Sequence, residues 1–272
     1  MSTFTRLVRF LARDGRVYYG DAILPRGVTD IAKTRQARIV TGDIFGKHEV
    51  TDQVADVRLL LAPLALEDVK TVRCLGLNYE KHANESNMPI PKYPVLFYKP
   101  VTSLAGPTDP IPVHQIAQEE AGLDYECELV AVIGKRCSDV SEADALKSSG
   151  VAASGPLGKG FDGWAPYGPG IVSSNLIKDP QTLKISTRIN GQTVQKENTA
   201  DMIFNVKQTI SFLSKGHTLL PGDLIFTGTP SGVGMGREPK LWLKDGDVVE
   251  VELESVGTCT NTVEFAKEAA KL

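Results

Sequence analysis

Three acidic residues at alternate positions, Asp124, Glu126 and Glu128, open a segment that becomes continuously apolar toward Ile133. In an extended strand, residues two apart point to the same face and lie roughly 6.6 Å apart, so two glutamates can converge on one hard cation. A solvated acidic face is the alternative interpretation. Because like charges that enter a core need a compensating cation, the pattern favours a metal site at Glu126 and Glu128.

A histidine and a glutamate three residues apart, His82 and Glu85, fall in a segment with helical character, residues 79–86. On a helix they share one face, where the carboxylate can orient the imidazole and raise its basicity. Such a pair suits a general base that takes a proton from water. From spacing alone, an ordinary surface His–Glu pair fits equally well.

Two glycine-rich segments offer groups that bind anions. Lys159 lies between Gly158 and Gly160, so its ammonium group and the backbone can approach a ligand closely, although the cluster alone favours a simple turn. Residues 227–234 follow an apolar strand and present hydroxyls and backbone N–H groups suited to an oxyanion. An ordinary surface turn is equally compatible with this segment, which lacks the ending of a phosphate-binding P-loop.

The elements that must position these residues are mostly strands. Alternating or continuous apolar patterns predict a hairpin over 5–24 and strands over 69–77, 94–99, 124–134, 183–189, 224–227 and 248–256. Helices are predicted over 79–86, 141–147 and 200–214. We therefore expect an α+β fold with a mixed, rolled sheet, divided into a small N-terminal lobe (1–66) and a main domain (67–272).

Composition excludes several classes of protein. The 272 residues carry a net charge of −3, which argues against nucleic-acid binding and against a polybasic membrane anchor. No apolar run reaches the ~18 residues of a membrane-spanning helix. The four cysteines form no C-x-x-C pair, which favours a reducing, cytoplasmic location. The final residues, 270–272 (AKL), resemble a peroxisomal address and give the alternative location.

Several short motifs, in this order, resemble those of the fumarylacetoacetate hydrolase superfamily, specifically its short acylpyruvase-like and oxaloacetate decarboxylase-like members. The matching pieces are 76–79 (GLNY) with His82 and Glu85, 94–97 (PVLF) with Lys99 and Pro100, 124–129 (DYECEL), 158–162 (GKGFD), 198–204 (NTADMIF) and 228–234 (GTPSGVG). The match extends from about Val69 to Val263, and the ordered set is far more specific than any one piece.

The resemblance implies a β-roll catalytic domain, commonly assembled as a homodimer, that binds Mg²⁺ or Mn²⁺, with Ca²⁺ as an alternative. Family members act on 1,3-dicarbonyl or α-keto acids as hydrolases, decarboxylases or tautomerases. By position, Glu126 and Glu128 resemble two metal ligands. The implied catalytic residues are His82, Glu85 and Lys159, and the implied substrate-binding residues are Thr229, Gly228, Asn78 and Tyr79.

One departure from the family pattern lies between about residues 147 and 158. Family members carry there a strand with an N-D-x-S-A-R-type motif, whose Asp supplies a third metal carboxylate and whose Arg lies near the site. Here residues 145–150 run almost directly to Gly158, and the motif is absent. We expect the loss of this strand to weaken metal binding and to leave an exposed edge in the central sheet.

The sequence therefore predicts a metal-dependent hydrolase that cleaves a C–C bond in an acylpyruvate-like or fumarylacetoacetate-like acid. A decarboxylase or tautomerase on the same scaffold is the first alternative. A catalytically silent relative, which lacks the third metal carboxylate, is the second. The expected partners are a small keto acid and a second copy of the chain.

Overall fold

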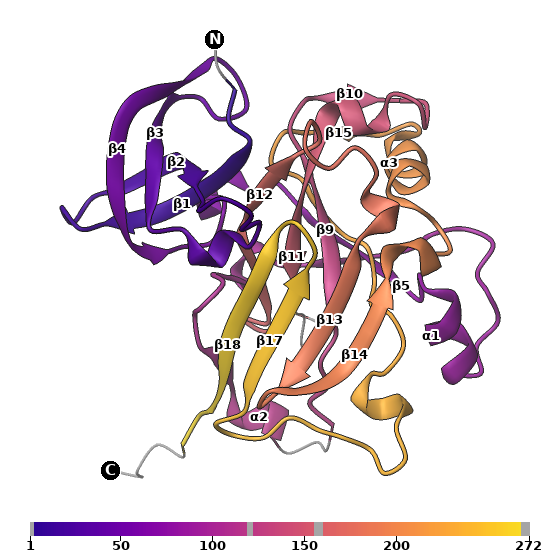
Figure 1. Ribbon diagram of the computed structural model, residues 1–272. Helices are drawn as coiled ribbons and strands as arrows, with labels where there is room; N and C mark the ends of the chain where they lie inside the picture. Colours follow the sequence, from indigo (N-terminus) through magenta and orange to yellow (C-terminus); the bar gives the residue numbers. More distant parts are fainter. Residues whose placement is uncertain (1–2, 119–121, 155–159, 268–272) are drawn as a thin grey trace.

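The computed structural model describes residues 3–118, 122–154 and 160–267. Lys159 and the C-terminal tripeptide 270–272 lie outside the described residues. In the described part of the chain, strands predominate and helices are few and short, so the predicted α+β class is confirmed (Figure 1).

The larger sheet has 11 strands among the described residues, in the order β2-β3-β4-β1-β12-β11-β9-β16-β5-β6, with β7 paired to β12. In chain order these are β1 (Arg6–Ala12), β2 (Val17–Ile23), β3 (Gln36–Gly42), β4 (His48–Leu60), β5 (Val72–Gly76), β6 (Val95–Lys99), β7 (Leu104–Ala105), β9 (Glu128–Ile133), β11 (Ser149–Ser154), β12 (Ala165–Ser173) and β16 (Leu224–Phe226). The sheet is mixed, because β16 pairs parallel with β5 and antiparallel with β9.

A five-stranded sheet packs on this one, in the order β14-β13-β17-β18-β8 (Figure 1). Its strands are β8 (Ile111–Val113), β13 (Lys184–Ile189), β14 (Gln192–Asn198), β17 (Val248–Leu253) and β18 (Gly257–Phe265). The remaining described elements include β10 (Cys137–Ser138), β15 (Thr218–Leu219), α1 (Glu80–Glu85), α2 (Gln115–Gln118), α3 (Val206–Ser214) and several short 3-10 helices. The predicted alternation of β17 is confirmed, since Val249, Val251 and Leu253 are buried.

Strand β9 lies at the centre of the fold and is buried on both faces. Leu129, Ala131 and Ile133 belong to the apolar core shared with the five-stranded sheet. Val130 and Val132 belong to a second core on the opposite face of the main sheet. A strand covered on both sides needs apolar residues at every position, which explains the continuous apolar run in its sequence.

The expected exposed edge in the central sheet is absent from the described structure. Strand β11 fills the place between β9 and β12, and it pairs antiparallel with both. An added Cβ on Gly150 would lie 2.9 Å from Ile171, so the small residues of this stretch permit close packing against β12. The prediction of an exposed edge was therefore wrong, because the glycine-, serine- and alanine-rich stretch itself forms a strand.

Two helix predictions also need correction. The segment 141–147 forms turns and a 3-10 helix at Ala145–Ser148 instead of an α-helix. The helix predicted over 200–214 begins only at Val206, because Asn205 caps it with a reciprocal capping box. The local cap at Asn205 therefore sets the start of the third predicted helix, whereas residues 141–147 form no α-helix.

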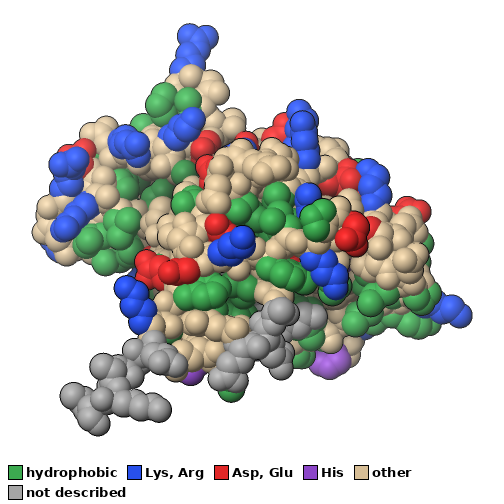
Figure 2. Space-filling model, turned by 90° about the horizontal axis from the view of Figure 1, so that it is seen from below, with side chains coloured by type: hydrophobic (Ala, Val, Ile, Leu, Met, Phe, Trp, Pro, Cys, Tyr) green, Lys and Arg blue, Asp and Glu red, His purple; other side chains and the backbone are tan. Residues whose placement is uncertain are grey.

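The N-terminal strands lie to one side of the molecule and join the main sheet through β1 (Figure 1). The predicted hairpin is formed by β1 and β2, and Arg6 of β1 pairs with Val172 of β12. Seen from below, basic and acidic side chains are interspersed on the surface (Figure 2). Among the described residues, no helix has the length and apolar character required to cross a membrane.

Candidate active site

The candidate residues meet at one edge of the main sheet. Strands β5 and β16 are parallel neighbours, so their carboxyl ends lie at the same edge, and β9 runs antiparallel to β16, so its amino end lies there too. This edge therefore collects α1 after β5, Glu128 at the start of β9, and the loop of residues 227–237 after β16. We call residues 227–237 the Gly-rich loop.

The predicted His–Glu pair is formed on α1. His82 Nδ1 lies 2.7 Å from Glu85 Oε1, and the two side chains are only 13% and 22% exposed. The backbone N–H of Gly232 donates to both oxygens of Glu85, at 2.9 and 3.1 Å. An ionised carboxylate only accepts hydrogen bonds, so Nδ1 carries the proton and Nε2 is left as the basic nitrogen.

Glu128 is buried at the start of β9, and Glu126 is partly buried just before it. The backbone N–H of Gly228 donates a hydrogen bond to Glu128 Oε2. The predicted strand over 124–134 begins only at Glu128, so residues 124–127 were wrongly included in it. The two glutamates, predicted as metal ligands, therefore lie at the boundary between a loop and a strand.

Asp124 binds backbone rather than continuing an acidic strand face. Its carboxylate accepts hydrogen bonds from the N–H groups of Gly234 at 2.6 Å, Met235 at 2.8 Å and Tyr125 at 2.8 Å. Burial raises the pKa of Asp124, while these N–H groups and nearby His82 act in the opposite direction. Asp124 therefore holds the Gly-rich loop close to the His–Glu pair.

Asn78 is buried and joins three segments of the chain. Its Nδ2 donates to the carbonyls of Thr227 at 2.8 Å and Phe204 at 3.0 Å, and its Oδ1 accepts from the N–H of Phe204 at 2.9 Å. These contacts give Asn78 a structural task, and its contact with substrate stays a prediction. Sequence reasoning placed Asn78 at the site but did not anticipate this clamp.

Tyr79 is fully buried, and its hydroxyl has no hydrogen-bond partner among the described residues. Burial, together with the neighbouring Cys127 and Glu128, raises its pKa well above the usual value. Burial also raises the pKa of the Cys127 thiol to about 12. Both groups are therefore neutral near pH 7, and Tyr79 can serve only as a neutral hydrogen-bonding group.

The Gly-rich loop uses much of its anion-binding capacity on the protein's own carboxylates. The N–H groups of Gly228, Gly232 and Gly234 bind Glu128, Glu85 and Asp124 respectively. Gly232 has φ +99°, and an added Cβ would lie 2.6 Å from the carbonyl oxygen of Val194. These three N–H groups were expected to bind an oxyanion of a ligand. They bind carboxylates of the protein instead, and these hydrogen bonds fix the loop.

Sequence reasoning missed two side chains that hold this loop, Tyr125 from outside it and Arg237 at its own end. Tyr125 donates its hydroxyl to the carbonyl of Gly232 at 3.0 Å. Arg237 Nε donates to the same carbonyl at 3.1 Å, and its guanidinium also binds the carbonyl of Val194. Neither residue stands at a spacing that signals a site, since their partners are backbone atoms brought near by folding.

The described residues do not complete a metal centre. No group of three His, Cys, Asp or Glu side chains within residues 3–118, 122–154 and 160–267 is arranged to hold a metal ion. Asp124, the nearest additional carboxylate in sequence, is already bonded to three backbone N–H groups. Glu126 and Glu128 alone therefore supply too few ligands for a three-carboxylate site of the kind that the resemblance implied.

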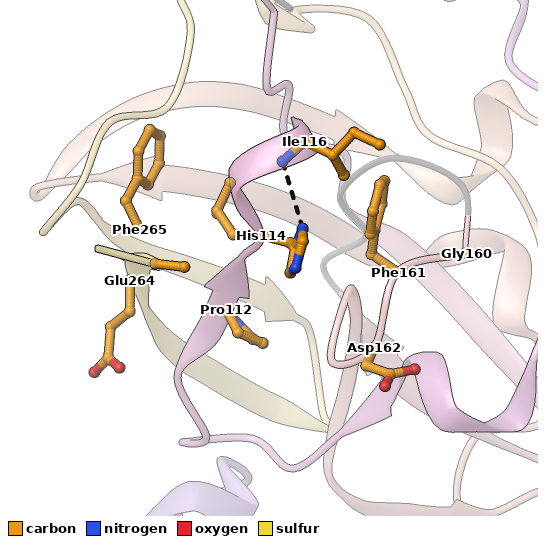
Figure 3. Close-up of a pocket in the computed structure, with 10 residues that line it drawn as sticks. Pro112, His114, Ile116, Gly160, Phe161, Asp162, Glu264 and Phe265 are labelled. Atoms are coloured by element: carbon orange, nitrogen blue, oxygen red, sulfur yellow. Dashed lines mark hydrogen bonds between the residues drawn. The ribbon is translucent and has the colours of Figure 1, made fainter. Parts of the chain in front are cut away.

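Residues 160–162, the described part of the segment that follows Lys159, border a separate hollow of about 660 Å³ (Figure 3). Phe161 and Asp162 line it together with His114 and Ile116, whereas His82, Glu85, Glu128 and Thr229 do not. The position of Lys159 lies outside the described residues, so its predicted catalytic role stays a prediction. We therefore assign the candidate site to the sheet edge rather than to this hollow.

Comparison with known proteins identifies the family. The family model described as "Fumarylacetoacetate (FAA) hydrolase C-terminal" matches residues 71–148 and 147–264. The chain belongs to the fumarylacetoacetate hydrolase family. The match divides into two pieces at residues 147–148, where the family's N-D-x-S-A-R-type motif was expected.

Named relatives of this family member are enzymes. Caffeoylpyruvate hydrolase from Neonothopanus nambi is 42% identical over 280 residues, which cover 98% of this chain and 95% of the relative. Mitochondrial oxaloacetate tautomerase fahd2 from Xenopus laevis is 40% identical over 221 residues, or 75% of this chain and 68% of the relative. The 280 aligned positions exceed the 272 residues of the chain, so the first relative carries residues that this chain lacks.

A solved structure confirms the fold of this family member. The 2-hydroxyhepta-2,4-diene-1,7-dioate isomerase from Mycobacterium marinum superposes with a TM-score of 0.80 at 33% identity, covering 97% of this chain and 100% of that one. The chain is therefore an enzyme of the fumarylacetoacetate hydrolase superfamily, whose relatives are named as hydrolases, tautomerases and isomerases.

Proposed function

We propose that this enzyme hydrolyses the C–C bond of an acylpyruvate-type 1,3-dicarbonyl acid. The observation that carries the proposal is the His82–Glu85 pair, held at 2.7 Å and bound through Glu85 to the Gly-rich loop. A relative named caffeoylpyruvate hydrolase, aligned over 98% of the chain, supports this substrate class.

The proposed reaction begins with His82. Its Nε2 takes a proton from water, and the resulting hydroxide attacks the carbonyl carbon farther from the carboxylate. The C–C bond then breaks, its electron pair moves into the enolate of pyruvate, and the acyl part leaves as a carboxylic acid. The enolate finally takes up a proton to give pyruvate, so one water is consumed for each substrate.

The surrounding contacts support this role for His82. Glu85 stabilises the imidazolium that forms, and Gly232 fixes Glu85 in turn. We assign to the Thr229 hydroxyl, beside Gly228, a hydrogen bond donated to an oxygen that gains negative charge. Lys159 is proposed as a cationic group that stabilises the same negative charge, by resemblance to the family's active-site lysine.

Product analysis tests the proposal. We expect the purified enzyme to convert acetylpyruvate to pyruvate and acetate in equal amounts, measured by proton NMR and by coupled lactate dehydrogenase. A tautomerase is the second candidate, favoured by the relative named oxaloacetate tautomerase. Keto–enol exchange of oxaloacetate with no cleavage of acetylpyruvate would select that candidate, and turnover of neither compound would overturn both.

The predicted Mg²⁺ or Mn²⁺ cofactor has a separate test. Of the three metal carboxylates that the family pattern implies, this chain retains two, Glu126 and Glu128. We therefore expect Mn²⁺ to bind with a dissociation constant of about 1 mM or weaker. Calorimetric titration measures this value. Glu126→Gln should weaken the binding further, whereas Glu250→Gln, on the five-stranded sheet, should not. Micromolar binding unaffected by Glu126→Gln would contradict the assignment.

Association into a homodimer and a cytoplasmic location stay predictions. The tautomerase relative is named as mitochondrial, so location can differ between members of this family. Sedimentation of the purified chain measures the first property, and imaging of a tagged chain with and without Leu272 measures the second.

A further inference from the structure

Gln195 is a buried side chain that no motif singled out, and it links the acidic segment to the Gly-rich loop. It lies on β14 and is 1% exposed. Its Oε1 accepts from the N–H of Cys127 at 3.0 Å and from the hydroxyl of Thr187 at 2.7 Å. Its Nε2 donates to Thr229 Oγ1 at 2.9 Å and to the carbonyl of Pro230 at 3.0 Å.

These partners fix the orientation of the Gln195 amide. The N–H of Cys127 can only donate and the carbonyl of Pro230 can only accept, so the oxygen must face Cys127 and the nitrogen must face Pro230. A flipped amide would place two donors together and two acceptors together. The nitrogen therefore donates to Thr229 in the only arrangement that satisfies all four contacts.

The orientation of the Gln195 amide determines which hydrogen bonds the Thr229 hydroxyl can make. Its oxygen already accepts from Gln195, and no acceptor for its own proton lies among the residues that the structure describes. Thr229 is 5% exposed and follows Gly228, whose N–H binds Glu128. The hydroxyl is therefore left as a hydrogen-bond donor at the edge of the sheet where the candidate residues meet.

We propose that Gln195 is a positioning residue that commits the Thr229 hydroxyl to donating its proton to the substrate oxygen that gains negative charge. This inference rests on the proposed function and adds a residue to it. Because such a hydrogen bond strengthens as the enolate forms, its loss should lower kcat and kcat/KM together and leave KM nearly unchanged.

The test uses Gln195→Glu in the full-length enzyme. A carboxylate at this position keeps the two accepted hydrogen bonds but offers none, so the Thr229 hydroxyl must turn its proton toward it. We expect kcat for acetylpyruvate to fall about 10²-fold, close to the loss expected for a removed oxyanion donor. Gln192→Glu makes the same chemical change at an exposed position of the same strand and should leave kcat unchanged.

A double-mutant cycle separates positioning from a merely structural role. If Gln195 acts through Thr229, then Gln195→Glu should add little further loss in a Thr229→Val background. Additive losses, or near-wild-type kcat in Gln195→Glu, would overturn the inference. If circular dichroism shows that Gln195→Glu does not fold, the Thr229→Val and Thr229→Ser variants test the inference instead. Only Thr229→Val, which lacks the hydroxyl, should lose about 10²-fold in kcat.

A binding measurement keeps this inference distinct from the proposed function. Oxalate presents two adjacent carboxylates that mimic the enolate of an α-keto acid, and its affinity can be measured by calorimetry without turnover. We expect Gln195→Glu to weaken oxalate binding at least tenfold in the wild-type background and not in the Thr229→Val background. An unchanged oxalate affinity in Gln195→Glu would overturn the role of Gln195. If Gln195→Glu weakens oxalate binding as expected but the wild-type enzyme does not cleave acetylpyruvate, only the proposed hydrolysis is overturned.

Discussion

Replacing His82 by alanine is expected to lower kcat/KM for acetylpyruvate cleavage about 10³-fold, within the range measured for removal of a general base. The physical reason is that no other imidazole in the described structure is paired with a carboxylate at this edge of the sheet. The fold should be retained, because the His82 ring bonds only to Glu85 among the described residues. Steady-state kinetics and thermal unfolding measure the two effects.

A matched control for this substitution is His217→Ala. His217 is exposed, and its ring bonds only to the carbonyl of Lys215 within the described chain. This variant should cleave acetylpyruvate at the wild-type rate. Equal losses in the two variants, or full activity in His82→Ala, would reject His82 as the base.

The same variant separates the two candidate reactions. Tautomerisation of oxaloacetate requires an enolate but no attacking water. A His82→Ala enzyme that still exchanges the tautomers but no longer cleaves acetylpyruvate would therefore place His82 in water activation. Loss of both reactions would assign it a proton transfer that the two reactions share.

Replacing Asn78 by alanine is expected to reduce the free energy of unfolding by about 3 kcal/mol. The substitution removes three hydrogen bonds and leaves the buried carbonyl of Thr227 and the N–H of Phe204 without their partner, and each unsatisfied group costs ~1–3 kcal/mol. For a chain of this size the melting temperature should fall by roughly 6–10 °C. Denaturant unfolding and calorimetry measure the two quantities.

Asn84→Ala is the control for this loss of stability. Asn84 lies on α1 but is exposed, so its removal should change the free energy of unfolding by less than about 0.5 kcal/mol. A wild-type melting temperature in Asn78→Ala would show that the clamp contributes little. Normal stability combined with a raised KM would instead support the predicted contact between Asn78 and substrate.

Elements with a clear apolar pattern were predictable from the sequence. The hairpin of β1 and β2, the buried run of β9 and the alternation of β17 follow directly from where apolar residues stand. Element ends were less predictable, as the late start of β9 and of α3 shows. Ends depend on which backbone groups find partners elsewhere in the chain, and spacing alone does not contain that information.

The Gly-rich loop illustrates a prediction that had the right residues and the wrong partners. Its composition indicated N–H groups suited to an anion, and the structure shows that they bind anions of the protein itself, Glu85, Asp124 and Glu128. These carboxylates come from segments about 100 to 147 residues away along the chain. No local pattern could identify them as the ligands of the loop.

The sequence by itself determined the family, the α+β class and the short-range pair of His82 and Glu85, because these depend on motif order, periodicity and the geometry of one helical turn. The tertiary structure alone decided that β11 closes the central sheet, that Asn78 clamps three segments, and that Gln195 reaches Thr229. The physical reason is strand pairing. Because β16 pairs parallel with β5 and antiparallel with β9, segments that are far apart in the sequence meet at one edge of the sheet, where their polar groups form hydrogen bonds with one another.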